Sequence, residues 1–234
     1  MVWLHNDSGD TARLFRLDVR RQTVRTVKVR GAEAVDWEDM AAAPNGDLVI
    51  GDIGDNGSSR TSVALYRVGD PGKGASAPTA RTQLLAYEDG AHDAEALVVD
   101  PENDVTYVIT KTTGGEAGVY VAEGKTLRRV ATVTLAEGGF LFPNRITAAD
   151  AIPDGSGVVL RTYQSGYILR RRKQSPWSTV WSATPEPFSL PAMVQGESIC
   201  VQRDSSAVLT TTESRGATKI PFAFTALPGI KGAL

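Results

Sequence analysis

Apolar and polar residues alternate in short runs along most of the chain, and turn-forming residues separate these runs. Between residues 35 and 56, two apolar runs flank a Pro-Asn-Gly turn at residues 44–46, with Asp36 and Glu38 before the first run and Asp52 after the second. Alternation with a period of two indicates β-strands, and Pro, Asn and Gly favour tight turns. This stretch therefore predicts a β-hairpin whose open end is acidic.

The same strand–turn–strand unit recurs along the chain. It begins again near Asp93, Thr147 and Gly196, at a spacing of roughly 50 residues, which is typical of the blades of a β-propeller. Aromatic residues that follow the hairpins keep a similar spacing, at Phe15, Tyr66, Tyr120, Tyr167 and Phe222. We expect these aromatic side chains to pack between blades.

We therefore predict an all-β fold, a five-bladed β-propeller that forms one domain over residues 1–234. The blades are expected near residues 1–33, 34–91, 92–144, 145–194 and 195–234. In the fourth blade we expect the outer strand near residues 177–183. The pattern offers no inner strand for the first blade and no fourth strand for the last, so both blades are expected to be incomplete.

A missing inner strand leaves backbone N–H and C=O groups unpaired, which is unfavourable. The pattern therefore favours a natural start upstream of Met1, and such a segment has room for an export signal. As written, the sequence predicts a cytoplasmic protein, because residues 1–10 lack the basic and apolar regions of a signal peptide. No apolar run approaches the ~20 residues that span a bilayer.

Composition narrows the class of partner. The formal net charge is −2, and the basic run at residues 170–173 has no interleaved aromatic residues to stack on bases, so nucleic acid is not expected as a partner. Cys200 is the single cysteine, which excludes an internal disulfide and a cysteine-based metal site. We expect a monomer that binds a small molecule or an ion.

The blade sequences Glu-Ala-Leu-Val-Val-Asp-Pro-Glu-Asn-Asp at residues 95–104 and Ala-Asp-Ala-Ile-Pro-Asp-Gly-Ser-Gly at residues 149–157 carry a family resemblance. They resemble the bacterial β-propeller superfamily with NHL, YVTN and TolB-like repeats, and are similar to the esterase-like propellers related to phytases. The resemblance covers nearly the whole chain and implies the fold. Phytase-like propellers hold calcium with clustered acids, and the resemblance points to Asp52, Asp55 and Asp7 here.

Propeller geometry predicts where the candidate chemistry lies. Inner strands start, and second strands end, on one face of the disc near its axis. The inner-strand starts carry Glu38, Glu95 and Glu197, and the second-strand ends carry Asp7, Asp52, Lys111, Arg161, Tyr163 and Glu213. Burying so many carboxylates together is costly unless cations, protons or a metal balance their charge.

This predicted acidic mouth leaves several functions open. It can be a self-neutralised polar plug, or a binding site for a small ligand through Asp7, Lys111, Arg161, Tyr163 and Glu213. It can also hold Ca²⁺ through Glu38, Asp52, Glu95 and Glu197. The first choice is a binding protein for a cation or small ligand.

The alternative is a metal-assisted hydrolase of the esterase, lactonase or phosphoesterase type, with His5 or His92 as general base. A second alternative is a scaffold that binds proteins. The sequence contains no G-x-x-x-x-G-K-[ST], G-x-S-x-G or H-E-x-x-H motif, so P-loop, α/β-hydrolase and zincin chemistry are not expected.

Overall fold

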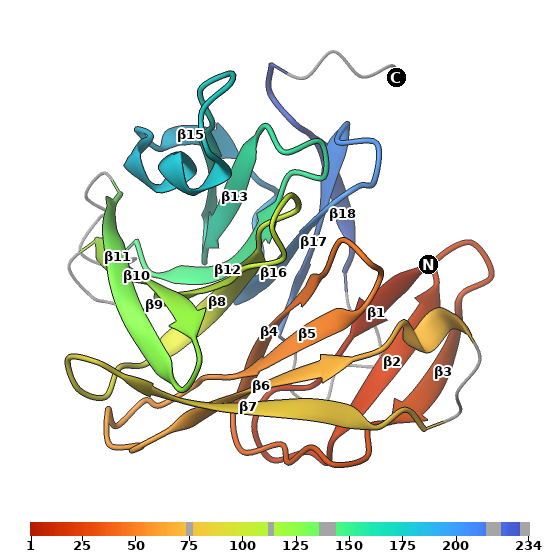
Figure 1. The fold of residues 1–234 in the computed structure, drawn as a ribbon. Helices are drawn as coiled ribbons and strands as arrows, with labels where there is room; N and C mark the ends of the chain where they lie inside the picture. Colours follow the sequence, from red (N-terminus) through yellow and green to blue (C-terminus); the bar gives the residue numbers. More distant parts are fainter. Residues whose placement is uncertain (74–76, 112–114, 136–143, 214–220, 230–234) are drawn as a thin grey trace.

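The computed structural model describes residues 1–73, 77–111, 115–135, 144–213 and 221–229. These residues form an all-β structure of four hydrogen-bonded sheets, arranged around a common centre (Figure 1). The first sheet contains β1 (Val2–Leu4), β2 (Arg13–Asp18) and β3 (Thr23–Lys28). The last contains β16 (Gly196–Val201), β17 (Ala207–Thr212) and β18 (Ala223–Ala226).

The second and third sheets form the body of the fold. The second sheet contains β4 (Trp37–Ala42), β5 (Leu48–Asp52), β6 (Val63–Val68) and β7 (Ala80–Tyr87), followed by β8 (Ala94–Val99), β9 (Thr106–Thr110), β10 (Glu116–Glu123) and β11 (Thr126–Thr134). The third contains β12 (Ile146–Ala151), β13 (Gly157–Thr162), β14 (Ser165–Arg170) and β15 (Glu186–Ser189).

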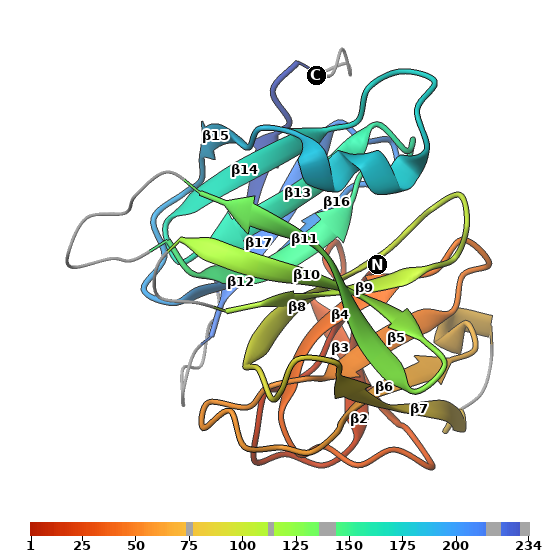
Figure 2. The ribbon, with the colours of Figure 1, turned by 60° about the vertical axis from the view of Figure 1, so that its left-hand side comes forward.

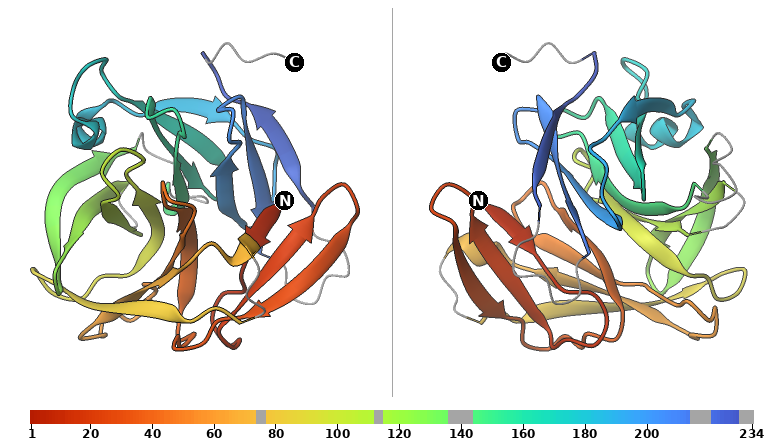
Figure 3. Two further views of the ribbon diagram at one scale, coloured as in Figure 1. Left: turned by 45° about the vertical axis from the view of Figure 1, so that its right-hand side comes forward. Right: turned by 180° about the vertical axis from the view of Figure 1, so that it is seen from behind.

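The eight-stranded second sheet is two antiparallel four-stranded units joined at their outer strands. β7 and β11 pair in parallel where Ala86 meets Thr126 and Tyr87 meets Leu127. The sheet curls round until its two end strands, β4 and β8, lie side by side (Figure 3). The result is a nearly closed, barrel-like sheet.

The turns that join each inner strand to its second strand share one backbone geometry. Each contains one residue with positive φ, at Gly46, Asp104, Gly155 or Ser205. Glycine adopts this conformation without steric cost, and Asp tolerates it better than most residues. The Pro-Asn-Gly turn expected from the sequence is closed by a hydrogen bond from the Gly46 amide to the Ala43 carbonyl at 2.9 Å.

The hydrophobic core is divided among four clusters that lie between successive units. Trp37 and Tyr66 pack against Leu14 of the first sheet, whereas Tyr120 is buried where the two halves of the second sheet face each other. Tyr167 is buried in the cluster between β8–β11 and the third sheet. The expectation that these recurring aromatic residues are core is thus confirmed for the second, third and fourth repeats.

The predicted outer strand near residues 177–183 is wrong. Trp177–Ser182 form a 3₁₀ helix, and the outer strand of the third sheet is β15 instead. The physical reason is aromatic packing: the rings of Trp177 and Trp181 lie 5.8 and 5.3 Å from the ring of Tyr107. A compact helical turn lets both indoles reach this core, which an extended strand, with alternating side chains, would present differently.

The first and last sheets have three strands each, and they flank one another on the side where the N-terminus lies (Figure 3). Within the described residues, β1 pairs with β2 alone, and β18 pairs with β17 alone. The sequence pattern predicted these shortened units.

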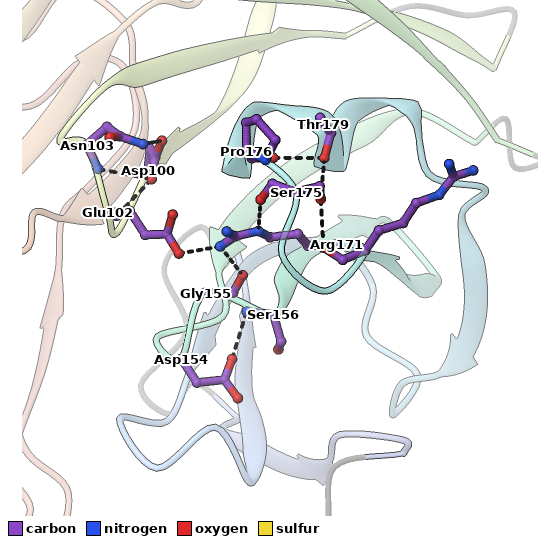
Figure 4. Close-up of polar contacts among 11 residues, drawn as sticks. Asp100, Glu102, Asn103, Asp154, Gly155, Ser156, Arg171, Ser175, Pro176 and Thr179 are labelled. Atoms are coloured by element: carbon purple, nitrogen blue, oxygen red, sulfur yellow. Dashed lines mark hydrogen bonds and ion pairs between the residues drawn. The ribbon is translucent and has the colours of Figure 1, made fainter.

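On the face that carries the inner-strand turns, arginines connect neighbouring units (Figure 4). Arg171 follows β14, pairs with the Glu102 carboxylate in the β8–β9 turn and donates to the Gly155 carbonyl. Arg67 makes a bidentate pair with Asp104, at 2.7 and 2.9 Å. These ion pairs lie at the turn ends of the hairpins, whereas Glu38, Glu95 and Glu197 lie at the open ends.

No helix in the described part of the chain is long and apolar enough to span a membrane.

Candidate functional site

Each of the four inner strands β4, β8, β12 and β16 has a β-bulge near its start, and these strands converge at the centre of the molecule (Figure 2). The extra residue, which has no cross-strand partner, is Glu38, Glu95, Thr147 or Glu197. A bulge re-aims the side chain of its extra residue. We call these four residues, with Asp7, Asp36, Lys111, Tyr163 and Glu213 beside them, the funnel.

Three carboxylates meet where β1 ends and β4 begins. Oxygen atoms of Asp7, Asp36 and Glu38 all lie within 4.8 Å of one another, and the three side chains are half-buried. Burial, followed by the carboxylates of Glu95, Asp7 and Asp36, raises the pKa of Glu38 to about 10. Burial also raises the pKa of Asp36. Glu38 therefore retains its proton at neutral pH or exchanges it for a cation.

Gly54 closes one side of the trio. A methyl group on its α-carbon would overlap Glu38 Oε1 and Asp36 Oδ2, so both carboxylates lie against bare backbone. The Gly54 amide also donates to the Asp36 carbonyl at 3.2 Å. Only glycine permits this close approach, which explains one of the glycines in the Gly-Asp-Ile-Gly-Asp-Asn-Gly loop.

Glu95 and Lys111 form an ion pair beside the trio. Burial would lower the pKa of Lys111, but the Glu95 carboxylate outweighs burial, and the pKa is raised. Burial raises the pKa of Glu95 to about 7 although Lys111 opposes this shift. The ammonium also hydrogen-bonds to Tyr163 and lies 5.6 Å from the centre of the Tyr163 ring.

Glu197 and Arg161 occupy the side of the funnel formed by β13 and β16. Burial, with help from Glu213 and Glu95, raises the pKa of Glu197 to about 7. The Arg161 side chain is fully buried, and burial lowers its pKa to about 10 although Glu197 opposes this. Its Nη1 donates to the Ser198 carbonyl at 3.3 Å, whereas Nε and Nη2 have no hydrogen-bond partner in the described structure.

Asp52, which the sequence predicts as a metal ligand, contacts the backbone that leads into the trio. Its carboxylate accepts hydrogen bonds from the Val35 and Asp36 amides, at 3.1 and 3.2 Å. It also pairs with Arg60 Nη2 at 2.8 Å. Because these donors use its oxygens, Asp52 holds the backbone of Asp36 in place. Asp55, which the family resemblance suggested, accepts from the Arg60 amide at 2.7 Å.

The two histidines lie apart from each other. His5 packs edge-on against Trp37, with ring centres 5.9 Å apart, and burial lowers its pKa. His92 contacts Asp89 at 2.9 Å and the Tyr120 hydroxyl at 3.0 Å. His5 is close enough to Asp7 to interact with its charge, whereas among the described residues His92 bonds to Asp89 and Tyr120 and to no member of the trio. A role as general base remains a prediction for either residue.

Beneath the funnel, buried aspartates tie the inner strands together. Asp39 Oδ2 accepts the Leu97 amide of β8 at 2.9 Å and the Ala149 amide of β12 at 3.2 Å. Asp150 Oδ2 accepts the Val201 amide of β16 at 2.8 Å. These bonds replace a backbone ladder between inner strands. They fix the relative positions of the bulges, and hence of the funnel carboxylates.

Sequence reasoning missed Asp36 as a member of the site, and also the supporting role of Gly54. Asp36 precedes Glu38 by two residues, a spacing that places two side chains on one face of a regular strand. The stretch was recognised as acidic, but the bulge at Glu38 and the loop around Gly54 decide that both carboxylates meet Asp7. No local pattern encodes that meeting.

The fold and the acidic funnel together define a β-propeller-like, all-β protein. No family model and no curated protein matches the chain. The chain is similar to the periplasmic gluconolactonase PpgL of Pseudomonas aeruginosa, with a TM-score of 0.53, 14% identity, and coverage of 98% of this chain and 69% of that one. This likeness concerns the fold.

The structure of U3-55K is also similar, at 11% identity and a TM-score of 0.46, over 88% of this chain. The chain spans 58% of the length of U3-55K. A TM-score this low supports no conclusion about function.

Proposed function

We propose that the chain is a five-bladed β-propeller whose funnel binds a divalent cation, most suitably Ca²⁺, together with a small ligand. Support for the blade count comes from the recurring unit of bulged inner strand, positive-φ turn and second strand, which occurs four times. The sheet β1–β3 then corresponds to a fifth blade that begins at its second strand.

The observation that carries the cation site is the mutual approach of Asp7, Asp36 and Glu38 within 4.8 Å. Carboxylate oxygens are the ligands that Ca²⁺ prefers, and it takes six to eight oxygens in flexible geometry. Three acids this close repel one another when all are ionised. Burial, followed by this repulsion, raises the pKa of Glu38. The trio therefore fits a hard cation, and we propose Glu95, whose charge acts on Glu38, as a further ligand.

The proposed ligand set differs from the one expected from sequence. Glu38 and Glu95 stay, whereas Asp7 and Asp36 take the place of Asp52, whose oxygens are used by two amides and Arg60. Glu197 lies beside Glu213 and Arg161, and we assign it to ligand binding.

Calorimetric titration of metal-free protein with Ca²⁺ tests this proposal. The wild-type chain should bind, and Glu38→Gln should weaken binding by at least about tenfold, which corresponds to about 1.4 kcal/mol. Glu123→Gln is the matched control, because Glu123 is exposed and pairs with Arg128 away from the trio. Absence of Ca²⁺ binding by the wild-type chain, or equal loss in both variants, would contradict the cation site.

A second candidate function is metal-assisted hydrolysis of an ester, lactone or phosphoester. The observation that favours it is the pKa of about 7 for both Glu95 and Glu197, beside the trio. A carboxyl group with this pKa can take and return protons near neutral pH. In this reading a bound cation would polarise the substrate, and Glu95 or Glu197 would move the proton.

Turnover of a panel of simple esters, lactones and phosphoesters, measured with and without Ca²⁺, separates the two candidates. A hydrolase should lose turnover in Glu197→Gln while its unfolding transition and Ca²⁺ binding persist. A binding protein should show no turnover in any variant.

A further inference from the structure

The funnel is electrically asymmetric. The trio of Asp7, Asp36 and Glu38 lies where β1 and β4 meet. The cations lie on the other strands: Lys111 directly follows β9, and Arg161 belongs to β13. The two sides adjoin, because Lys111 pairs with Glu95 of β8, and β8 lies beside β4. Each cation has an acid beside it, Glu95 at Lys111 and Glu197 at Arg161, so a ligand in the funnel would meet acids alone at the trio and acid–cation pairs on the other strands.

Lys111 has hydrogen-bonding capacity left over. An ammonium group has three N–H donors, and the described contacts of Lys111 use two, one to Glu95 and one to Tyr163. Its side chain is 12% exposed, so the group remains reachable from the mouth. The Tyr163 ring, 5.6 Å away, limits where the ammonium can move and so prepares it to receive an acceptor.

Arg161 supplies an independent sign of an anionic ligand. In the strand register, Arg161 pairs with Ala148 as Ile109 pairs with Ala96 and Gly51 with Asp39. A buried guanidinium thus stands where the equivalent repeats have the uncharged residues Ile109, Gly51 and Thr211. Its Nε and Nη2 lack partners in the described structure, and it interacts with Glu197 in the funnel. Buried unpaired cations are costly, so this one adds positive potential to one side of the funnel.

We propose that the funnel binds a small carboxylate, whose anionic group accepts from Lys111 and Tyr163 while its remaining oxygens face the trio. Lys111 is the contact residue, and Arg161 acts as a positioning charge beneath it. A carboxylate fits because it offers acceptors to an ammonium and to a hard cation together. The inference rests on the proposed cation site, since a cation at the trio removes the repulsion between the ligand and the acids.

Saturation-transfer NMR with acetate as the probe, and acetamide as the neutral isostere, tests this. The wild-type chain should bind acetate with Ca²⁺ present, at least about tenfold more weakly without Ca²⁺, and should not bind acetamide. Lys111→Met should abolish acetate binding yet strengthen Ca²⁺ binding, because a positive charge leaves an acidic site. A merely structural role for Lys111 would weaken both.

Two further variants keep the test decisive if Lys111→Met folds poorly. Tyr163→Phe removes one hydroxyl and should weaken acetate binding without changing Ca²⁺ affinity. Lys111→Arg should retain part of the acetate binding. Acetate binding that is unchanged in Tyr163→Phe and Lys111→Met, or absent in Ca²⁺-bound wild type, would overturn the carboxylate site alone. Failure of Ca²⁺ to bind wild type would instead overturn the cation site on which it rests.

Discussion

The Glu38 carboxylate lies against the α-carbon of Gly54, with no room between them for a methyl group. This relationship joins a bulged inner strand to the loop that follows the neighbouring strand. It also holds the trio together, because the same glycine touches Asp36. The approach of backbone to carboxylate is therefore a determinant of the proposed cation site that does not itself supply a ligand.

Gly54→Ala should disrupt the trio. The new methyl group must push Glu38 and Asp36 aside, so Ca²⁺ affinity measured by calorimetry should fall by at least about tenfold. Gly57→Ala is the control in the same loop, since its methyl group would meet only Ser59 Oγ at 3.5 Å. Equal Ca²⁺ affinities in wild type and Gly54→Ala would show that the trio does not hold the ion.

Arg161→Met should stabilise the fold. The change removes a buried guanidinium with two unpaired nitrogens and keeps most of its volume, so the free energy of unfolding should rise by about 1–3 kcal/mol. Denaturant titration measures the difference. Gly196→Ala should destabilise wild type, because its methyl group would overlap Arg161 Nη2, and should cost much less in the Arg161→Met background. A loss of stability in Arg161→Met would show that the surroundings of the guanidinium stabilise its charge.

The stability of the metal-free protein should fall as pH rises from about 4.5 to about 7. Burial raises the pKa of Glu95 and of Glu197 from 4.5 to about 7, so the folded state binds protons more tightly than the unfolded chain. Stability from these groups is complete below the unfolded pKa and is lost as pH passes the folded pKa. Thermal unfolding across this range measures the slope, and the double variant Glu95→Gln/Glu197→Gln should flatten it.

Added Ca²⁺ should reverse that trend. Cation binding requires deprotonated carboxylates, so the rise in melting temperature caused by a fixed Ca²⁺ excess should grow with pH, as linkage to the folded state demands. The Glu38 carboxyl, with a pKa of about 10, should release its proton on binding, and calorimetry in buffers of different ionisation enthalpy counts that proton. A Ca²⁺ effect that is independent of pH would argue against the trio as the binding group.

Asp39→Ala should lower the free energy of unfolding more than any other single change beneath the funnel. It leaves the buried Leu97 and Ala149 amides without their acceptor, and each such loss costs about 1–3 kcal/mol, or about 2–6 kcal/mol together. Asp154→Ala is the control, because Asp154 also accepts an amide, that of Ser156, but in an exposed turn. Comparable losses in the two variants would show that the Asp39 bonds do not hold the inner strands together.

Local sequence signals specify the repeating hairpins. The alternation of apolar residues, the Pro-Asn-Gly turn and the recurring aromatic residues are local signals, because strand periodicity and turn chemistry act over a few residues. They predicted the all-β fold, the shortened first and last units, and the placement of Tyr66, Tyr120 and Tyr167 in the core. The stretch 177–183 was misread because its shape depends on Tyr107, which lies far away in the chain.

Long-range packing, by contrast, sets which polar residues lie together. Glu38 and Glu95 were expected near one another, but the bulges that aim them interrupt the strand period, so counting residues cannot place their side chains. Asp36 lies in the trio and Asp52 lies outside it, because the long-range contacts of Gly54 and Arg60 determine where each carboxylate points. The role of a carboxylate here follows from its neighbours in space, and those neighbours come from strands and loops that are far apart in the chain.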